Sequence, residues 1–439
     1  MKDKLKILAL ITASLVLTSC QDLNISQLKT MVQAFKTEQK VQENEITSDI
    51  TEDENLAQDS KIYQEVFPEE SEEEIEESEE EVSEWEESLE PEEKETEEDH
   101  QTKFVAGGDI MFHMNQVRAA QREDGTYDFK SSFDYVRPYL EKGFAIGNFE
   151  TTIGDEEVSA YPLFWTPKES LEAVKSAGFD LVALANNHSL DGGLAGVTRT
   201  LDTAHANDFK TTGTFKIDDT QALPSIINID GRDIAFLNYT YGLNGLDPWL
   251  EGNDHMINRL DEDKILKDIA YAKDHARGTV AIVHWGTEYM LERDDNQAYW
   301  ARFLAENGVD IILGSHPHVV QGAEFIDHEG FKTYCIYSMG NFISDQRREF
   351  MDDGSPYSED GVLIELDIKG QGDRIYVERA SHYPTWVGKT TDPLAFTIYP
   401  CHDILDGKIE ASDLLRSRAQ ESFDRTRVRL AETMDSKEN

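Results

Sequence analysis

Five short polar segments, each placed directly after an apolar and β-branched run, constrain the fold of this chain more than any other feature. Short apolar runs of this kind predict buried strands, so each polar segment stands where a strand should end. Open α/β sheets build their binding sites at the carboxyl ends of their strands. The segments cover residues 108–113, 147–150, 186–188, 284–289 and 314–318. They predict an α/β protein with one site at the ends of its strands.

The polar segments carry carboxylate, amide and imidazole side chains. Taken singly, each has an ordinary explanation, such as an Asp that caps a loop or a His that is satisfied in a core. The strongest local signal is the pair His316 and His318 around Pro317, because two imidazoles two residues apart can address two neighbouring sites. Five such segments in succession suit two hard or borderline metal ions. The candidate metal ligands are Asp109, Glu150, Asn187, His284, His316 and His318.

Between these segments, short apolar runs alternate with helical stretches from Lys103 to about Val387. The first half has a βαβα order and the second half adds hairpins, which predicts a mixed sheet, or two packed sheets, flanked by helices. Strands are expected at 103–107, 144–149, 180–185, 279–283 and 309–313, with hairpins at 226–239 and 325–337 and an antiparallel pair at 362–368 and 374–379. Helices are expected at 133–140, 166–178, 194–207, 260–276 and 297–307, and residues 412–434 as a charged helix or tail.

The N-terminus has the organisation of a secretory signal. Lysines at positions 2, 4 and 6 precede an apolar run from Ile7 to Leu17, which is shorter than the about 20 residues needed to span a bilayer. The ending Leu-Thr-Ser-Cys at 17–20 resembles the bacterial lipoprotein signal, in which Cys20 becomes the lipidated N-terminus. The alternative is an ordinary cleaved signal with an incidental Cys. The favoured interpretation places the protein outside the cytoplasm, anchored to a bacterial cell membrane by lipid.

Residues 21–101 form an acidic segment that contributes −25 to the net charge of −47. A segment so charged and so poor in apolar residues is expected to be a disordered tether. The remaining chain from Thr102 carries −24, and its composition argues against nucleic-acid binding. The predicted organisation is a lipoprotein signal peptide at 1–20, the tether at 21–101, one domain at 102–395 and a helical or flexible C-terminal tail at 396–439.

The order of the motifs resembles the bacterial capsule synthesis CapA family, whose domain is similar to the calcineurin-like metallophosphoesterases. The resemblance covers roughly residues 102–350. It implies a metallophosphoesterase sandwich of two packed mixed β-sheets flanked by helices. The motifs that carry it are Gly-Asp-Ile-Met at 108–111, Asn-Phe-Glu-Thr-Thr-Ile at 148–153, Asn-Asn-His-Ser-Leu-Asp-Gly-Gly at 186–193, His-Trp-Gly-Thr-Glu-Tyr at 284–289, Gly-Ser-His-Pro-His-Val-Val-Gln at 314–321 and Tyr-Ser-Met-Gly-Asn-Phe at 337–342.

The resemblance also implies roles for these residues, around two divalent ions such as Mn, Fe or Zn. Asp109 and His318 would bind one ion, Asn187, His284 and His316 the other, and Glu150 would bridge them. His188 would be the catalytic histidine that assists the leaving group or stabilises the charge of the transition state. Residues expected to support the metals or contact substrate are His113, Asn148, Asn186, Glu288 and Asn341.

The first motif departs from the pattern of the wider superfamily, which has Asp-x-His where this chain has Asp109-Ile110-Met111. Two explanations remain open from the sequence. Either His113, four residues after Asp109, substitutes for the missing histidine, or the first metal site lacks one ligand.

Three functions are compatible with the sequence. The first is a dinuclear metal hydrolase in the biosynthesis, export or anchoring of a poly-γ-glutamate capsule. The second is a non-catalytic, metal-containing subunit that binds or assembles the polymer, although the domain charge of −24 argues mildly against simple polyanion binding. The third is a surface nucleotidase or phosphodiesterase. The expected partners are the membrane, through the lipid anchor, together with capsule synthesis or export membrane proteins and an anionic polymer.

Overall fold

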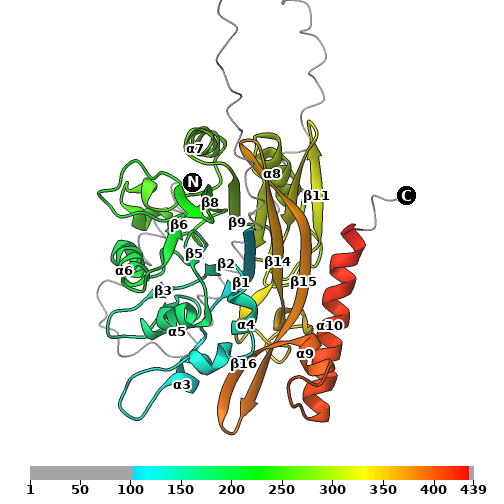
Figure 1. The fold of residues 1–439 in the computed structure, drawn as a ribbon. Coiled ribbons are helices and arrows are strands. Elements are labelled where there is room, and N and C mark those ends of the chain that lie inside the picture. The colour runs from blue at the N-terminus through cyan, green and yellow to red at the C-terminus, as the bar shows by residue number, and fades with distance from the viewer. Residues whose placement is uncertain (1–101, 435–439) are drawn as a thin grey trace, which may run out of the picture. The chain divides into compact units, whose positions relative to one another are not determined.

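Two mixed β-sheets form the centre of residues 102–434, the part of the chain that the computed structural model describes (Figure 1). The predicted signal peptide, Cys20 and the acidic tether lie outside these described residues. Within residues 102–434, no helix is both long and apolar enough to cross a membrane.

The first sheet has eight strands. Four neighbouring strands, from the centre of the sheet to one edge, run parallel to one another. A long antiparallel hairpin extends it on the other side, and a short strand adds to β1 in parallel. Its order is β16 (Leu394–Pro400), β15 (Arg374–Thr391), β14 (Asp360–Gln371), β1 (Thr102–Ile110), β2 (Phe144–Phe149), β5 (Leu181–Ala183) and β6 (Lys210–Thr212), with β13 (Asn341–Ile343) beside β1.

The second sheet has six strands, with a parallel centre and an antiparallel strand at each edge. Its order is β11 (Ala323–His328), β12 (Phe331–Ile336), β10 (Ile311–Ser315), β9 (Thr279–His284), β8 (Arg232–Thr240) and β7 (Ser225–Ile229). A separate small sheet pairs β3 (Thr152–Ile153) with β4 (Trp165–Thr166). The prediction of two packed mixed sheets is therefore confirmed.

The alternation of side chains along the strands explains how the sheets pack. Phe104 and Ala106 of β1 belong to the core between the sheets, together with Phe236 of β8 and Val280 of β9. Val105, between the first two, faces the opposite core, where helices cover the first sheet. Successive residues of a strand point to opposite faces, so a strand buried on both faces is apolar throughout.

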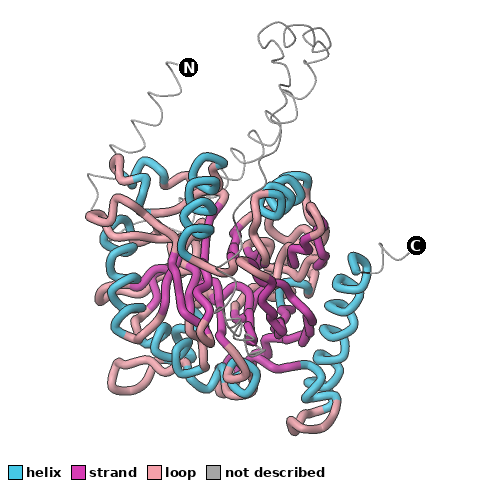
Figure 2. The backbone as a smooth tube through the Cα atoms, turned by 45° about the horizontal axis from the view of Figure 1, so that its top comes forward, coloured by secondary structure: helices cyan, strands magenta, loops and turns pink. Residues whose placement is uncertain are grey.

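Helices cover the outer faces of both sheets, and Figure 2 shows the strands inside and the helices at the periphery. Helices α5 (Glu169–Ala177) and α6 (Gly193–Ala206) pack on the first sheet, and α7 (Glu262–His275) and α8 (Asp295–Glu306) pack on the second. The remaining helices are α3 (Met114–Ala120), α4 (Arg137–Leu140), α9 (Cys401–Leu405), α10 (Asp413–Met434) and the 3-10 turns Lys130–Phe133, Asp247–Leu250, Asp254–Met256 and Tyr357–Glu359.

Two sequence predictions need correction. The helix expected at 133–140 is only α4, preceded by a 3-10 turn, because Pro138 fits only the first turn of a helix and so fixes its start at Arg137. The antiparallel pair expected at 362–368 and 374–379 is a much longer hairpin, β14 and β15. In addition, the expected tail boundary at 395 falls inside β16, which pairs with β15 in the first sheet.

Candidate dinuclear metal site

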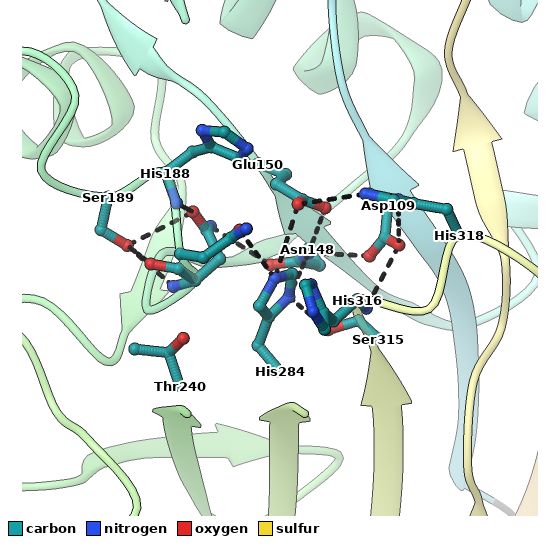
Figure 3. A network of polar contacts seen from close by, with 12 residues as sticks. Asp109, Asn148, Glu150, His188, Ser189, Thr240, His284, Ser315, His316 and His318 are labelled. Atoms are coloured by element: carbon teal, nitrogen blue, oxygen red, sulfur yellow. Dashed lines mark hydrogen bonds and ion pairs between the residues drawn. The ribbon is translucent and has the colours of Figure 1, made fainter. Parts of the chain in front are cut away.

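The candidate ligands come from the carboxyl ends of strands in both sheets. Asp109 is the next-to-last residue of β1, and Glu150 follows the last residue of β2. His284 ends β9, and His316 follows the last residue of β10. Figure 3 shows these side chains converging where the two sets of strand ends meet. The placement at strand ends agrees with the sequence prediction.

Two glycines allow the backbone segments beneath the site to approach closely. A Cβ atom on Gly108 would lie 1.9 Å from the carbonyl oxygen of Gly340, and one on Gly314 would lie 2.1 Å from that of Tyr337. The first approach brings the amide of Asp109 to 2.9 Å from the Gly340 oxygen. It also sets β13 beside β1, so that Asn341 lies opposite Asp109 in the register.

One group of metal-binding side chains consists of Asp109, Glu150 and His318, whose ligand atoms all lie within 4.8 Å of one another. His318 Nδ1 is 3.2 Å from Asp109 Oδ2, and His318 Nε2 is 3.7 Å from Glu150 Oε1. All three side chains are buried. This group contains both residues that the resemblance assigns to the first ion.

A second group consists of Glu150, His284 and His316, again within 4.8 Å. His284 Nε2 is 3.4 Å from Glu150 Oε1 and 3.0 Å from Asn187 Oδ1. The structure therefore brings Asn187 beside this group as a further oxygen donor. Glu150 belongs to both groups, which is the position that a bridging ligand requires.

The electrostatics around Glu150, His284 and His316 fit a bound divalent cation. Glu150 Oε1 and His316 Nδ1 are buried atoms without a hydrogen-bond partner, although buried polar atoms are almost always paired. Burial, followed by the nearby charge of Asp109, raises the pKa of Glu150. Burial lowers the pKa of His284 to about 3 and that of His316 well below its usual range. Neutral imidazoles beside crowded carboxylates are the forms that bind metal.

Neighbouring side chains orient the ligands. Asn148 Nδ2 donates to Asp109 Oδ1 at 2.8 Å and lies 3.4 Å from Glu150 Oε2. Asn341 Oδ1 lies 3.1 Å from Nδ1 of His318. The sequence analysis expected both residues in this supporting role, but it missed Ser315, whose hydroxyl is 3.0 Å from Nδ1 of His284. Such contacts fix the ring orientation of a metal-binding histidine.

Asn186 supports the site through the backbone. Its Nδ2 donates to the carbonyl oxygen of Phe149 at 2.9 Å, and its Oδ1 accepts from the amide of His188 at 3.1 Å. These bonds tie the loop after β5 to the end of β2. They thereby hold Asn187 and His188 in place near Glu150.

His188 lies outside the groups of metal ligands found in residues 102–434. Its Nδ1 is 2.8 Å from Asp191 Oδ2, and that same oxygen accepts the amide of Phe164 at 2.7 Å. The ring of Phe164 packs edge-on against the imidazole, with centroids 4.7 Å apart. The sequence analysis missed Asp191, although its position three residues after His188 in the same motif was a usable signal.

His113 does not take the place of the missing histidine in the described structure. It belongs to none of the metal-binding groups found there. Its Nδ1 accepts the amide of Asp345 at 3.3 Å, its ring packs edge-on against Phe164, and burial lowers its pKa to about 3. The structure thus favours the second explanation, in which the first metal site lacks that ligand.

Glu288 lies at the solvent side of the site. It is exposed, yet one of its carboxylate oxygens lies within 4.8 Å of ring nitrogens of both His316 and His318. Of the residues selected from the sequence, Asp109, Glu150, His284, Glu288, His316 and His318 thus form the groups that could hold metal.

Comparison with known proteins identifies relatives of this chain. The chain is 29% identical over 275 residues to "PGA biosynthesis protein CapA" of Bacillus subtilis (strain 168), which covers 60% of this chain and 67% of that protein. It is 28% identical over 296 residues to "Capsule biosynthesis protein CapA" of Bacillus anthracis, which covers 63% of this chain and 66% of that protein. The chain thus spans about two thirds of the length of these relatives.

Similar solved structures include the calcineurin-like phosphoesterase YfkN from Bacillus subtilis, at 13% identity and a TM-score of 0.38, covering 74% of this chain and 97% of that one. A putative 5'-nucleotidase from Staphylococcus aureus matches at 12% identity and a TM-score of 0.40, covering 74% and 58%. The family model described as "Bacterial capsule synthesis protein PGA_cap" matches residues 103–346. Because this match covers more than half of the chain, the protein belongs to the bacterial capsule synthesis protein PGA_cap family.

Proposed function

We propose that this protein works at the bacterial cell surface in the biosynthesis, export or anchoring of a poly-γ-glutamate capsule, as a hydrolase with two metal ions. The names of its relatives support the capsule role. The buried ligand groups support the metal site. A lipid on Cys20 would hold the domain at the membrane, where it would meet capsule synthesis or export proteins and the polymer itself.

The position of Glu150 is the observation that carries the proposal of two metals. Its Oε1 lies 3.4 Å from Nε2 of His284 and 3.7 Å from Nε2 of His318, which belong to different ligand groups. The atom is fully buried and has no hydrogen-bond partner. A carboxylate in this position offers oxygen to one ion on each side. Without cations, its charge would be repelled by that of Asp109.

The chemistry follows from what each group contributes. Two divalent ions held there would supply Lewis acidity, which activates water and neutralises charge on the group that is cleaved. Asn148 and Asn341 hold Asp109 and His318 in fixed orientations. Burial of the ligands excludes competing water from the inner side of the site. The substrate approaches from the side on which Glu288 is exposed.

His188 is the proton donor in this proposal. Asp191 bonds to Nδ1 of the ring and orients it, which leaves Nε2 to donate a proton to the leaving group. Phe164 fixes the ring through its edge-on contact and through the amide that it donates to Asp191. In this proposal Asp191 orients His188 in the way that a buried carboxylate orients the histidine of a catalytic triad.

The experiment compares the full-length wild-type protein with His188→Ala on a panel of phosphodiester and γ-glutamyl substrates, with metal content measured in parallel. His188→Ala should slow turnover by about 10²–10⁴-fold, as expected for loss of a general acid, and leave the metal content unchanged. His275→Ala is the matched control, because His275 is exposed on α7 and away from the site. Hydrolysis that does not depend on His188 would contradict its role.

The same variants separate the hydrolase from a binding subunit. If the protein only binds polymer, His188→Ala should preserve capsule formation in cells, whereas Glu150→Ala should disturb it through metal loss. A hydrolase requires both residues for capsule formation. Capsule formation that survives both substitutions would contradict a role for this site in the capsule.

A further inference from the structure

The loop between β9 and α8 carries Glu288 over the solvent side of the metal site. Its carboxylate lies within 4.8 Å of His316, which belongs to the ligand group with His284, and of His318, which belongs to the group with Asp109. Glu150 contacts the same two groups from the buried side. Both carboxylates therefore lie close to ligands of both groups, Glu150 buried and Glu288 exposed.

This loop is fastened to the site despite its exposure. The amide of Tyr289 donates to the carbonyl oxygen of Pro317, the residue between the two histidines, at 2.8 Å. Gln321 Nε2 donates to the carbonyl oxygens of Met290 and Glu292, at 2.9 and 3.1 Å. These bonds fix the backbone on the C-terminal side of Glu288. Its carboxylate is thus held near the histidines.

The backbone is strained at this same place. Tyr289, His316 and His318 have φ angles of 64°, 97° and 57°, in the left-handed region that favours glycine. Non-glycine residues seldom adopt it, although Asn, Asp and His do so more often than the others, and such strain persists where surrounding structure enforces it, commonly at functional sites. Here, the strain lies at two ligands and at the residue that follows Glu288.

The two ligand groups differ in the number of protein donors around them. Asp109, Glu150 and His318 give three protein ligands, whereas the other group has Asn187 beside it as a fourth. His113 does not join the first group. Divalent metals take four or more ligands, and carboxylate oxygen suits Mn²⁺ and Zn²⁺. Glu288 is a further acidic residue whose carboxylate lies close to His316 and His318.

We infer that Glu288 is a metal ligand on the solvent side of the site, beside His316 and His318, and that it completes the coordination of one of the two ions. This inference rests on the proposed pair of metals. It assigns Glu288 a direct bond to metal, rather than the role of supporting the metals or contacting substrate that was expected from sequence. An exposed ligand is also the one that a substrate oxygen can displace without disturbing the buried ligands.

The test is a Mn²⁺ titration of the full-length protein, with free Mn²⁺ followed by electron paramagnetic resonance. Glu288→Gln should weaken binding of one of the two ions at least tenfold and leave the other within twofold. Glu292→Gln is the matched control on the same loop, because its carboxylate pairs with Arg429 and joins no ligand group. It should leave both ions within twofold. Thermal melts in EDTA check that each variant is folded.

The outcomes separate this inference from the function on which it rests. If the wild type binds two ions and Glu288→Gln binds both equally tightly, Glu288 is not a ligand, while the dinuclear site stands. If the wild type binds no Mn²⁺, Zn²⁺ or Fe²⁺, the proposed site and this inference both fall. If Glu292→Gln weakens Mn²⁺ binding as much as Glu288→Gln does, the effect belongs to the loop as a whole and the assignment is wrong.

Discussion

Replacing Glu150 with Gln should remove most of the stability that divalent ions give this protein. The carboxylate is fully buried, and its Oε1 reaches the ligands of both groups. Gln keeps the size of the side chain but removes its charge. Glu150→Gln should therefore weaken the binding of both ions. Substitution of a residue that binds one ion, such as Asp109, should mainly weaken the binding of that ion.

The magnitude follows from binding linkage. An ion present at 100 times its Kd stabilises the folded state by about 2.7 kcal/mol, so two ions give about 5 kcal/mol. At about 2 °C per kcal/mol for a chain of this size, metal should raise the Tm of the wild type by about 10 °C. If each affinity falls about 100-fold, the remaining gain is about 0.4 kcal/mol per ion, or about 2 °C in total.

The opposite effect is expected without metal. Burial and Asp109 raise the pKa of Glu150 above its unfolded value, so the carboxyl group costs stability at neutral pH, and this cost disappears as the pH falls below about 4.5. In EDTA at pH 7, Glu150→Gln should therefore be at least as stable as the wild type.

Differential scanning calorimetry with EDTA and with Mn²⁺ measures both effects, with Glu306→Gln on the surface of α8 as the control. An equal Mn²⁺-dependent rise in Tm for wild type and Glu150→Gln would refute the bridging role.

Three further predictions concern other parts of the chain. Cys20→Ala should move the protein from the membrane fraction to the soluble fraction, and unchanged retention would contradict the lipid anchor. Burial alone would raise the pKa of Glu359, but hydrogen bonds from Arg348 hold that pKa at about 2. The ionised carboxylate therefore contributes about 3 kcal/mol to the stability of the fold, and this contribution should be lost as the pH falls from about 4.5 towards 2. Urea unfolding should show a shallower pH dependence of stability for Glu359→Gln than for the wild type. Gly108→Ala should cost at least about 2 kcal/mol in urea, because its Cβ would meet the Gly340 oxygen at 1.9 Å, while Gly242→Ala, with open space around it, should cost far less.

Local sequence patterns were sufficient for most of the parallel strands, although not for the short strands β6 and β13, and they placed the candidate ligands at strand ends. Strands buried on both faces are continuous apolar runs, and the run at 144–149 matches β2 residue for residue. Polar residues at the ends of such runs marked the ligands for the same reason. The order of strands within the sheets depends on pairing between distant segments, which no local pattern contains.

The long hairpin of β14 and β15 was underestimated because polar residues interrupt its apolar pattern. Glu365 and Asp367 of β14 are nearly buried and pair with Lys103 of β1. Opposite charges on neighbouring strands let such residues occupy a strand, but the partner lies far away in the sequence. The partners of the histidines, Ser315 and Asp191, were missed for a related reason, since common polar residues reveal a role only through their distance to a ligand.

The central claim is that this chain holds two divalent ions in one site, and the metal content of the purified protein tests it most directly. Inductively coupled plasma mass spectrometry after loading with Mn²⁺, Zn²⁺ or Fe²⁺ should find close to two ions per wild-type chain under at least one supply. Glu150→Ala should lose both ions and Asp109→Ala mainly one. A wild-type protein that retains no divalent ion under any of these supplies would contradict the account.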